Sequence, residues 1–318
     1  MSEAGSELDL EAIQGRLRPM WERIARAEKE LAAVTRKAWY FALLGFDADF
    51  EQYDVLGELA QIRGVAEPPD PMYLQFAADS PYGAGAVSRY SRGIRFELVL
   101  PASDSLSDEK HLTLAWQIIS AIRLSSLAEL LIPAVSDYPW STLPAIKDNR
   151  ARIRPIEDVP QAHVLTPGSK VTIEHLAWVA THFVSFMDLI ERPRFRLASE
   201  ALSTHHLQHG RRMMAANIWA GIEALVDVQT ELRFRLSAFL AALLEPPGPA
   251  RRALYKRIQK LYDLRSKVVH GAAVEEAAIR DHTIEARTLL ARVMRNCVER
   301  NALVTCEDFE RALFEGAT

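Results

Sequence analysis

The stretch ARRALYKRIQKLYDLRSKVVHG, residues 250–271, decides how the C-terminal part of this chain folds. Leu254, Ile258 and Leu261 recur at the spacing of one face of an α-helix, with charged residues between them. The proline that precedes the stretch suits a first helical turn, and Gly271 is a residue typical of a helix end. We therefore expect one helix that stops at Gly271.

Arg265 stands on the apolar face of this expected helix. At 100° per residue it lies about 20° from Leu254 and Ile258 and about 40° from Leu261 and Val269. A buried guanidinium without a partner is costly, because it loses its hydration. Either the side chain extends past the packed face, or that face borders a cleft that needs a cation.

His270 is the last residue before Gly271 and the second candidate for chemistry. On an ideal helix about 140° separates it from Arg265, so the two do not share a face within one chain. Ser266 is four residues before His270 and lies beside it. A second copy of the helix, or fraying at Gly271, would be needed to bring imidazole and guanidinium onto one phosphate. A symmetric dimer is the simplest arrangement that does so.

The rest of the sequence predicts a mainly α protein with two parts. We expect residues 1–165 to form a mixed α/β region, and residues 171–318 to form a helical domain. In the first part, helical periodicity predicts helices at residues 7–43, 50–62 and 108–131. Strand-like residues at 72–77 and 93–100 predict two strands with a loop between them. Residues 134–170 show no clear periodicity and are expected to be irregular. In the second part, further helices are expected at 173–190, 195–228 with a break near Gly210, 231–244 and 275–300, and Thr305 caps a short last one.

The net charge of −4 is unevenly distributed. Residues 1–210 carry 21 Lys and Arg against 28 Asp and Glu, whereas residues 211–300 carry 16 against 10. A basic segment in an acidic protein suits a polyanion, although a solvated helix face gives the same pattern. The acidic N-terminus predicts no signal peptide, and the interrupted apolar stretch 112–135 predicts no membrane span. Two cysteines without metal spacing favour a reducing, cytoplasmic compartment.

Other motifs carry weaker signals. His205 and His209 stand four residues apart and could bind a metal, but no carboxylate or cysteine is in register, which favours an exposed polar face. The run Tyr82-Gly83-Ala84-Gly85 lacks the lysine of a phosphate-binding loop. Most tryptophans lie on apolar helical stripes, which indicates core positions for Trp21, Trp39, Trp116, Trp178 and Trp219.

The run LYDLRSKVVHG, Leu261–Gly271, resembles the Arg-x4-6-His signature of the HEPN superfamily, and its surroundings resemble the Apea-like branch. IWAGIEAL, residues 218–225, is similar to the first bundle helix of that branch. ELRFRLSAFLAALL, residues 231–244, is similar to its second. The likeness covers about residues 195–315 and leaves residues 1–165 outside. An Arg and a His at this spacing are expected by chance in a chain of this composition, so the spacing alone is weak evidence and the context carries the resemblance.

The resemblance implies a four- to five-helix bundle that dimerises and places two Arg/His sets in a shared cleft. It implies an RNA endonuclease that needs no metal or other cofactor, in a toxin–antitoxin or phage-defence setting, with RNA, a second copy and an antitoxin or regulatory partner. Arg265 would neutralise the scissile phosphate, and His270 would act as general acid or base. The RNA 2′-hydroxyl would be the nucleophile.

Supporting roles are expected for Ser266, which replaces the family's usual Asn, Asp or His, and for Glu223. Arg252, Lys256, Lys260 and Lys267 would follow an RNA backbone, or would only solvate the helix. Two alternatives stay open. Arg265 could bridge helices while His270 satisfies carbonyls of the last turn. The chain could also be a catalytically degenerate HEPN protein that acts as an RNA-binding or oligomerisation module.

Overall fold

The computed structural model describes residues 10–103, 106–157, 170–208, 210–226 and 231–315. The described part is mainly helical and contains one small antiparallel sheet. Close contacts divide the chain into an N-terminal unit, which comprises Met1–Phe46, Phe50–His111 and Leu131–Glu157, and a C-terminal unit, which comprises Asp47–Asp49, Leu112–Leu130 and Asp158–Thr318. Residues 112–130, placed in the N-terminal region from sequence, therefore group with the C-terminal helices.

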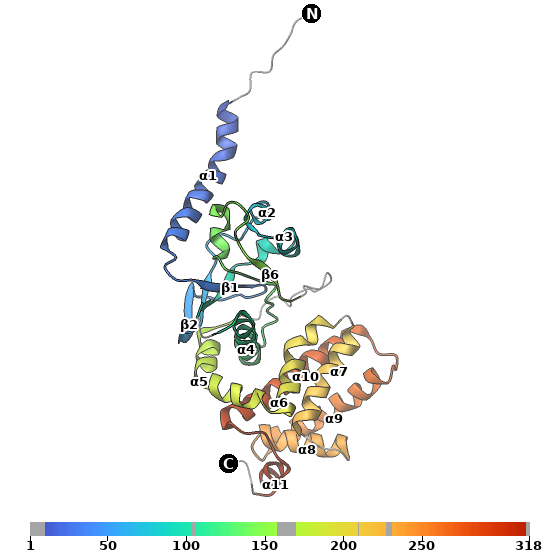
Figure 1. Cartoon of the computed structure of the whole chain (residues 1–318). Coiled ribbons are helices and arrows are strands. Elements are labelled where there is room, and N and C mark those ends of the chain that lie inside the picture. Colours follow the sequence, from blue (N-terminus) through green and yellow to red (C-terminus); the bar gives the residue numbers. More distant parts are fainter. Residues whose placement is uncertain (1–9, 104–105, 158–169, 209, 227–230, 316–318) are drawn as a thin grey trace, which may run out of the picture. The chain divides into compact units, whose positions relative to one another are not determined.

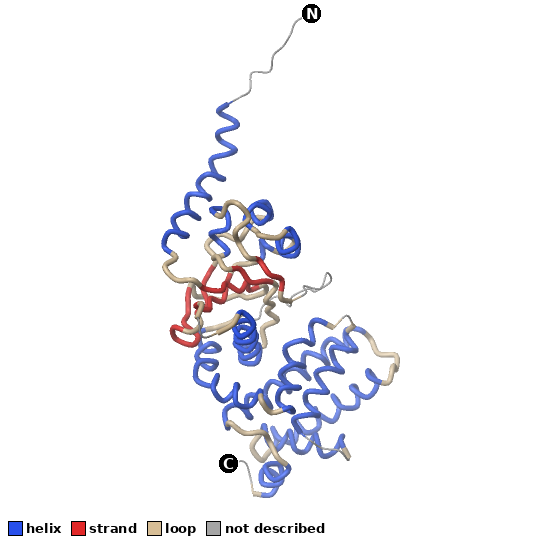
Figure 2. Tube along the Cα trace, in the orientation of Figure 1, coloured by secondary structure: helices blue, strands red, loops and turns tan. Residues whose placement is uncertain are grey.

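The N-terminal unit is built on a sheet of strand order β2-β3-β4-β1-β5-β6, drawn in red in Figure 2. Its elements are α1 (Leu10–Ala33), β1 (Ala38–Leu43), β2 (Gln52–Glu58), β3 (Gln61–Gly64), α2 (Pro71–Ala77), α3 (Pro81–Ser88), η1 (Ser91–Gly93), β4 (Phe96–Pro101), β5 (Ala134–Ser136), η2 (Trp140–Ala145) and β6 (Ile153–Pro155). The helix α4 (Asp108–Ser126) starts in this unit and continues in the other. β1 runs antiparallel to both β4 and β5.

One face of the sheet carries the core of this unit. Tyr40 and its strand neighbours pack there with residues from α2, α3 and η2, which lie on the same side of the sheet in Figure 1. The Trp140 indole N–H donates to the carbonyl of Tyr40 at 3.0 Å. Glu97 is buried, and its carboxylate accepts from the Arg63 side chain at 2.7 Å and from the backbone N–H of Trp140 at 3.0 Å. Burial raises the pKa of Glu97, and Arg63 opposes this shift. These contacts fix η2 to the sheet.

Two segments expected to be helical in this unit are strands, one at the end of the first expected helix and one in place of the second. The helix expected over 7–43 ends at Ala33, and residues 38–43 form β1, because the aromatic run AWYFAL is buried on both faces. The helix expected over 50–62 is the β2–β3 hairpin instead. Gly57 has a φ of +59°, which turns the chain out of a helical path.

Conversely, the strand expected over 72–77 is the helix α2. Asp70 accepts from the Met72 N–H at 2.9 Å, and a proline occupies the first turn. Ser80 caps α3 in the same way, within the segment expected to be a loop. Residues 134–157, expected to be irregular, contribute β5, η2 and β6. The strand expected over 93–100 is confirmed as β4.

The C-terminal unit contains the helices α5 (Ile173–Ile190), α6 (Pro193–Thr204), η3 (His205–Leu207), α7 (Arg211–Val226), α8 (Leu232–Leu244), α9 (Pro249–Val269), α10 (Glu276–Arg300) and α11 (Cys306–Phe314). The expected helices are present here. The break near Gly210 is confirmed, and Thr305 caps α11 by accepting from the Asp308 N–H.

Helix α7 is central to this unit, because α6, α8, α9 and α10 all pack against it. Its buried residues include Trp219, which is fully enclosed. At Gly221 a side chain would meet Ala201 at 3.0 Å and Leu290 at 3.1 Å, so the glycine permits the close approach of α6 and α10. This packing sets the relative positions of α7 and α9, which carry the residues singled out in the sequence.

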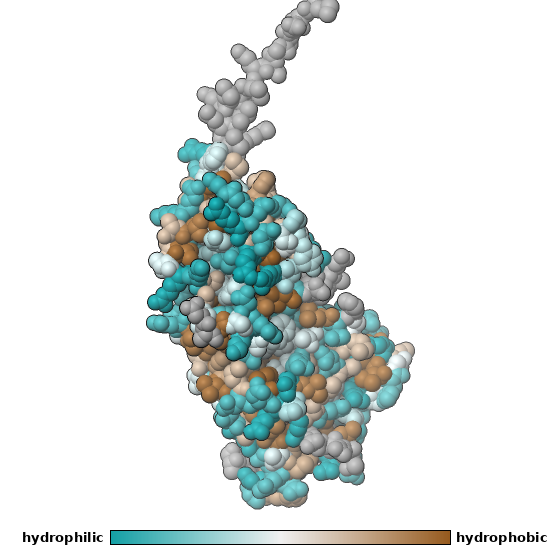
Figure 3. Space-filling view, viewed as in Figure 1, coloured by the Kyte–Doolittle hydropathy of each residue, from teal (hydrophilic) through white to brown (hydrophobic). Residues whose placement is uncertain are grey.

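Within the described ranges no helix is both long enough and apolar enough to span a membrane. On the face in Figure 3, hydrophobic residues are scattered among hydrophilic ones.

Candidate functional site

The C-terminal end of α9 is closed by a backbone turn that places His270. The Ala272 N–H donates to the carbonyl of Lys267 at 3.0 Å, and the Gly271 N–H reaches the carbonyl of Val268 at 3.5 Å. Gly271 has a φ of +77°, which a side chain would disfavour. His270 is the C-cap residue, and its side chain is exposed. The turn therefore fixes the backbone of a solvent-facing imidazole.

Arg212, in the first turn of α7, holds this turn from the side. Its Nη1 donates to the carbonyl of Val268 at 2.9 Å, and its Nη2 donates to the carbonyl of Ala272 at 2.8 Å. The two carbonyls flank His270 in the chain. Beneath them Val268 is buried in a small apolar cluster with Ala215 and Ile279. A charged clamp and an apolar cluster together fix the segment that carries His270.

Arg265 is half-buried on the face of α9 that packs against α7. Its Nη2 contacts both carboxylate oxygens of Glu223, at 2.9 Å to Oε1 and 3.1 Å to Oε2. The two side chains are 22% and 24% exposed. Burial raises the pKa of Glu223, and the charge of Arg265 opposes the shift. The apolar stripe continues from Arg265 to Val268, whereas Val269, expected on that face, is 42% exposed.

The Arg265 guanidinium has donors to spare. Only Nη2 engages Glu223, and Nη1 has no hydrogen-bond acceptor among the described residues. Nε also lacks an acceptor among these residues, but it is buried and closed to a ligand. A guanidinium carries five N–H donors in a fixed fork. The arginine is therefore held in place by one carboxylate while it keeps capacity for a further anion.

Aromatic rings connect Arg265 to the centre of the bundle. Its guanidinium lies over the Tyr262 ring, 5.7 Å from the centroid, and Tyr262 meets Trp219 edge to face at 5.7 Å. The Trp219 indole N–H donates to Nε2 of His282 at 2.8 Å, and these two rings are stacked. This row, from α9 through α7 to α10, defines the direction in which the guanidinium points.

His282 is a buried neutral imidazole. Because an indole N–H can only donate, Nε2 must accept and the ring proton must sit on Nδ1. Burial lowers the pKa of His282 to about 4. The ring is 2% exposed, and its Nδ1 has no partner within the described part of the chain. His282 thus anchors Trp219 and does not contact solvent.

The four basic residues singled out in the sequence are exposed on α9 together with His270. On an ideal helix Arg252, Lys256, Lys260 and Lys267 fall within an arc of about 80° that also includes His270. None of the four forms an ion pair with a described residue. Asp263 lies in the same arc, but Arg233 of α8 binds its carboxylate at 2.6 and 2.9 Å. The face is therefore positively charged.

Within one chain the two principal candidates stay apart. Arg265 faces α7, whereas His270 lies on the exposed basic face, about 140° away around the helix axis. The backbone carbonyl of Ser266 accepts from the His270 N–H at 3.1 Å. Arg265 thus contacts Glu223, whereas His270 lies on the basic face. One copy of the chain does not bring the guanidinium and the imidazole together.

Three residues that position Arg265 or the segment of His270 are not indicated by the sequence pattern. Arg212 and His282 act across 56 and 63 residues of chain, and Tyr262 was read only as part of the basic helix. A polar residue expected on a buried helix face would have been a signal for His282. No local pattern signals Arg212, because its acceptors are backbone carbonyls.

Other sequence expectations are corrected. His205 was expected on an exposed polar face but is 4% exposed, because its Nδ1 bonds the carbonyl of Leu202 inside the bundle. Its pKa is lowered to about 4 by burial. His209 lies outside the described residues, and no group of three metal ligands occurs among those described. Trp21 is 60% exposed on α1 and is not a core residue.

Comparison with known proteins finds no significant match to a protein-family model, a curated protein or a solved structure.

Proposed function

We propose that the C-terminal unit binds RNA along α9 and cleaves it without a metal ion, in the manner of HEPN-type ribonucleases. The observation that carries the proposal is the exposed His270 at the end of a face with four cations that form no ion pair with a described residue. Cations spaced along a helix neutralise successive phosphates. An imidazole near them can act as a general acid or base. Together these features would supply the phosphate contacts and the proton carrier of a metal-independent nuclease.

Arg265 supplies the second part of the proposed chemistry. A permanently charged, forked donor suits a phosphate whose charge grows in the transition state. Glu223 and Tyr262 hold its position, and its unused donors can bind a phosphate oxygen. Because Arg265 and His270 lie apart on one helix, we propose that the arginine of one copy acts with the histidine of a second copy in a symmetric dimer.

The reaction proposed is transfer of the phosphoryl group to the neighbouring ribose hydroxyl. The 2′-oxygen forms a bond to phosphorus, the bond from phosphorus to the 5′-oxygen breaks, and a proton moves from the 2′-hydroxyl to the leaving oxygen. His270 takes or gives this proton. The products are a 2′,3′-cyclic phosphate and a 5′-hydroxyl. DNA lacks the nucleophile and would be bound without being cut.

Purified protein incubated with single-stranded RNA in EDTA tests the proposal. We expect wild type to cut and to leave 5′-hydroxyl ends, and Arg265→Ala and His270→Ala to bind without cutting. Arg280→Ala is the matched control, because Arg280 is exposed and, among the described residues, pairs only with its neighbour Asp281. Cleavage by the control but by neither site variant would support the proposal.

The runner-up function is RNA binding or assembly without catalysis. The Arg265–Glu223 pair favours it, since an ion pair between packed helices needs no catalytic explanation. Binding of RNA by wild type and both site variants, with no cleavage by any of them, would establish this second function and reject the first.

A further inference from the structure

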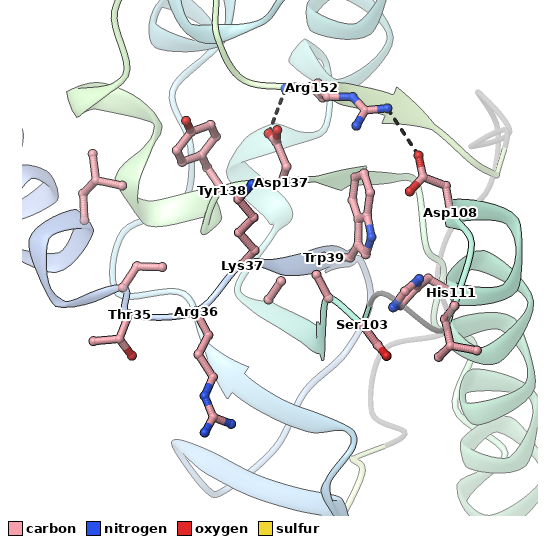
Figure 4. A pocket seen from close by; sticks show the side chains of 15 residues that line it. Thr35, Arg36, Lys37, Trp39, Ser103, Asp108, His111, Asp137, Tyr138 and Arg152 are labelled. Atoms are coloured by element: carbon pink, nitrogen blue, oxygen red, sulfur yellow. Dashed lines mark hydrogen bonds and ion pairs between the residues drawn. The ribbon is translucent and has the colours of Figure 1, made fainter.

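The N-terminal unit contains a cavity of about 460 Å³ at one end of its sheet. Since the sheet is antiparallel, the start of β1 and the ends of β4 and β5 meet at this end. Arg152, just before β6, and the first turn of α4 complete the walls, as Figure 4 shows. Cavities of this size accept small molecules. The cavity therefore belongs to one compact unit and is formed by several separate segments of it.

Several hydrogen-bond donors in the wall have no acceptor. Within the described ranges, the side chains of Thr35, Arg36, Lys37 and Tyr138 form no hydrogen bond or ion pair. Lys37 is held by its backbone, whose carbonyl accepts from the Ala102 N–H at 2.9 Å. In Figure 4 its side chain extends toward Asp137 and Tyr138, whereas Thr35 and Arg36 point away from it. The Lys37 ammonium and the Tyr138 hydroxyl are thus available to a ligand.

The acidic groups of the wall are already engaged. Asp137 accepts from the Arg152 N–H at 2.9 Å, and Asp108 pairs with Arg152 at 3.3 Å and with Arg154 at 3.5 Å. Burial raises the pKa of Asp137. Lys37 forms no ion pair with either acid within the described residues. A ligand therefore meets an unpaired cation and partly neutralised carboxylates, which favours an anion.

The remaining wall is apolar or closed to a ligand. Leu31, Val34 and Leu106 line it together with Trp39. The Arg152 guanidinium lies over the Trp39 ring, 5.4 Å from the ring centroid. The two ring nitrogens of His111 face the carbonyls of Ser107 and Pro101 at 3.0 and 3.3 Å. The imidazole is thus part of the wall and not a free ligand-binding group. The occupant must combine one oxyanion with a body that accepts apolar contact.

We propose that this cavity binds a phosphomonoester of mononucleotide size, with its phosphate on Lys37 and Tyr138 and its body against Trp39 and Leu31. The terminal oxygens of a phosphate can accept from the Lys37 ammonium and from the Tyr138 hydroxyl, and lysine binds phosphate as a point charge. This binding does not depend on ribonuclease activity in the C-terminal unit.

Isothermal titration calorimetry on the full chain tests this with adenosine 5′-monophosphate, ribose 5-phosphate and adenosine as probes. We expect both phosphates to bind with one site per chain, and adenosine to bind at least about tenfold more weakly. Lys37→Ala should weaken nucleotide binding by about tenfold, and Tyr138→Phe should weaken it by a smaller factor. Lys29→Ala, an exposed lysine on α1 outside the cavity, is the matched control and should bind like wild type.

The melting temperatures of these surface variants confirm that each is folded. The proposal is overturned if neither phosphate binds at about 1 mM. It is equally overturned if Lys37→Ala and Lys29→Ala bind the nucleotide with the same affinity, since the site would then lie elsewhere.

Discussion

Arg265 and Glu223 form an ion pair between α9 and α7, with the guanidinium Nη2 within 2.9 Å of the carboxylate. Each side chain keeps about a fifth to a quarter of its surface exposed. The pair ties the helix that carries the basic face to the centre of the bundle. It also holds a cation with unused donors at a fixed place, which is what the proposed phosphate contact requires.

Removal of the carboxylate should destabilise the fold. Glu223→Ala leaves the Arg265 guanidinium half-buried without an anion, and we expect the free energy of unfolding to fall by about 1–3 kcal/mol. Urea unfolding at pH 7 measures this. Asp263→Ala breaks the more exposed pair with Arg233 and should cost less, about 0.2–1 kcal/mol. Equal losses in the two variants would contradict a special role for Glu223.

His282 makes stability depend on pH. Its folded pKa of about 4 is below its ordinary value of 6.5, so the unfolded chain binds more protons between these values. The contribution of the neutral His282 to the free energy of unfolding is complete above pH 6.5 and is lost as the pH falls toward 4. His282→Gln keeps an acceptor for the Trp219 N–H. The difference in free energy of unfolding between wild type and this variant should be about 2 kcal/mol less favourable to wild type at pH 5 than at pH 7. An advantage that is equal at both pH values would show that His282 is not a buried neutral base.

Arg212 should control the order of the segment around His270. Arg212→Ala removes two hydrogen bonds to carbonyls on either side of that residue. We expect faster amide hydrogen exchange at residues 268–272 and a lower rate of RNA cleavage with unchanged RNA affinity. Arg211→Ala is the control, since Arg211 pairs with Glu276 on the surface. Identical exchange in the two variants would argue against the clamp.

The affinity for RNA should fall with increasing salt concentration because of the cations on the basic face of α9. Each of Lys256→Ala, Lys260→Ala and Lys267→Ala should reduce the slope of log affinity against log salt by about 0.7, if each lysine contacts one phosphate of a single strand. Fluorescence anisotropy with a labelled RNA at several salt concentrations measures the slope. Lys29→Ala should leave it unchanged. Slopes that do not respond to any of the three α9 lysines would remove this face from the proposed interface.

The C-terminal helices could be predicted because their signals are local. Apolar spacing, the proline and glycine at the ends of α9 and the Thr305 cap all act within a few residues. The N-terminal sheet could not be predicted in the same way. AWYFAL continues the apolar pattern of α1, and only its pairing with β4 and β5 makes it a strand. The direction of Arg265 was suggested by periodicity, whereas its row of ring contacts depends on Trp219 and His282, which tertiary packing brings together.

The central claim is that guanidinium and imidazole come from two different copies of the chain. Mixing Arg265→Ala with His270→Ala protein tests it directly, after denaturation and joint refolding, by measuring RNA cleavage in EDTA. Each variant alone should be inactive. If the active pair forms between copies, every mixed dimer contains one intact site, and a random mixture should recover about a quarter of wild-type activity. A mixture of the two folded variants that stays as inactive as its components would contradict the claim.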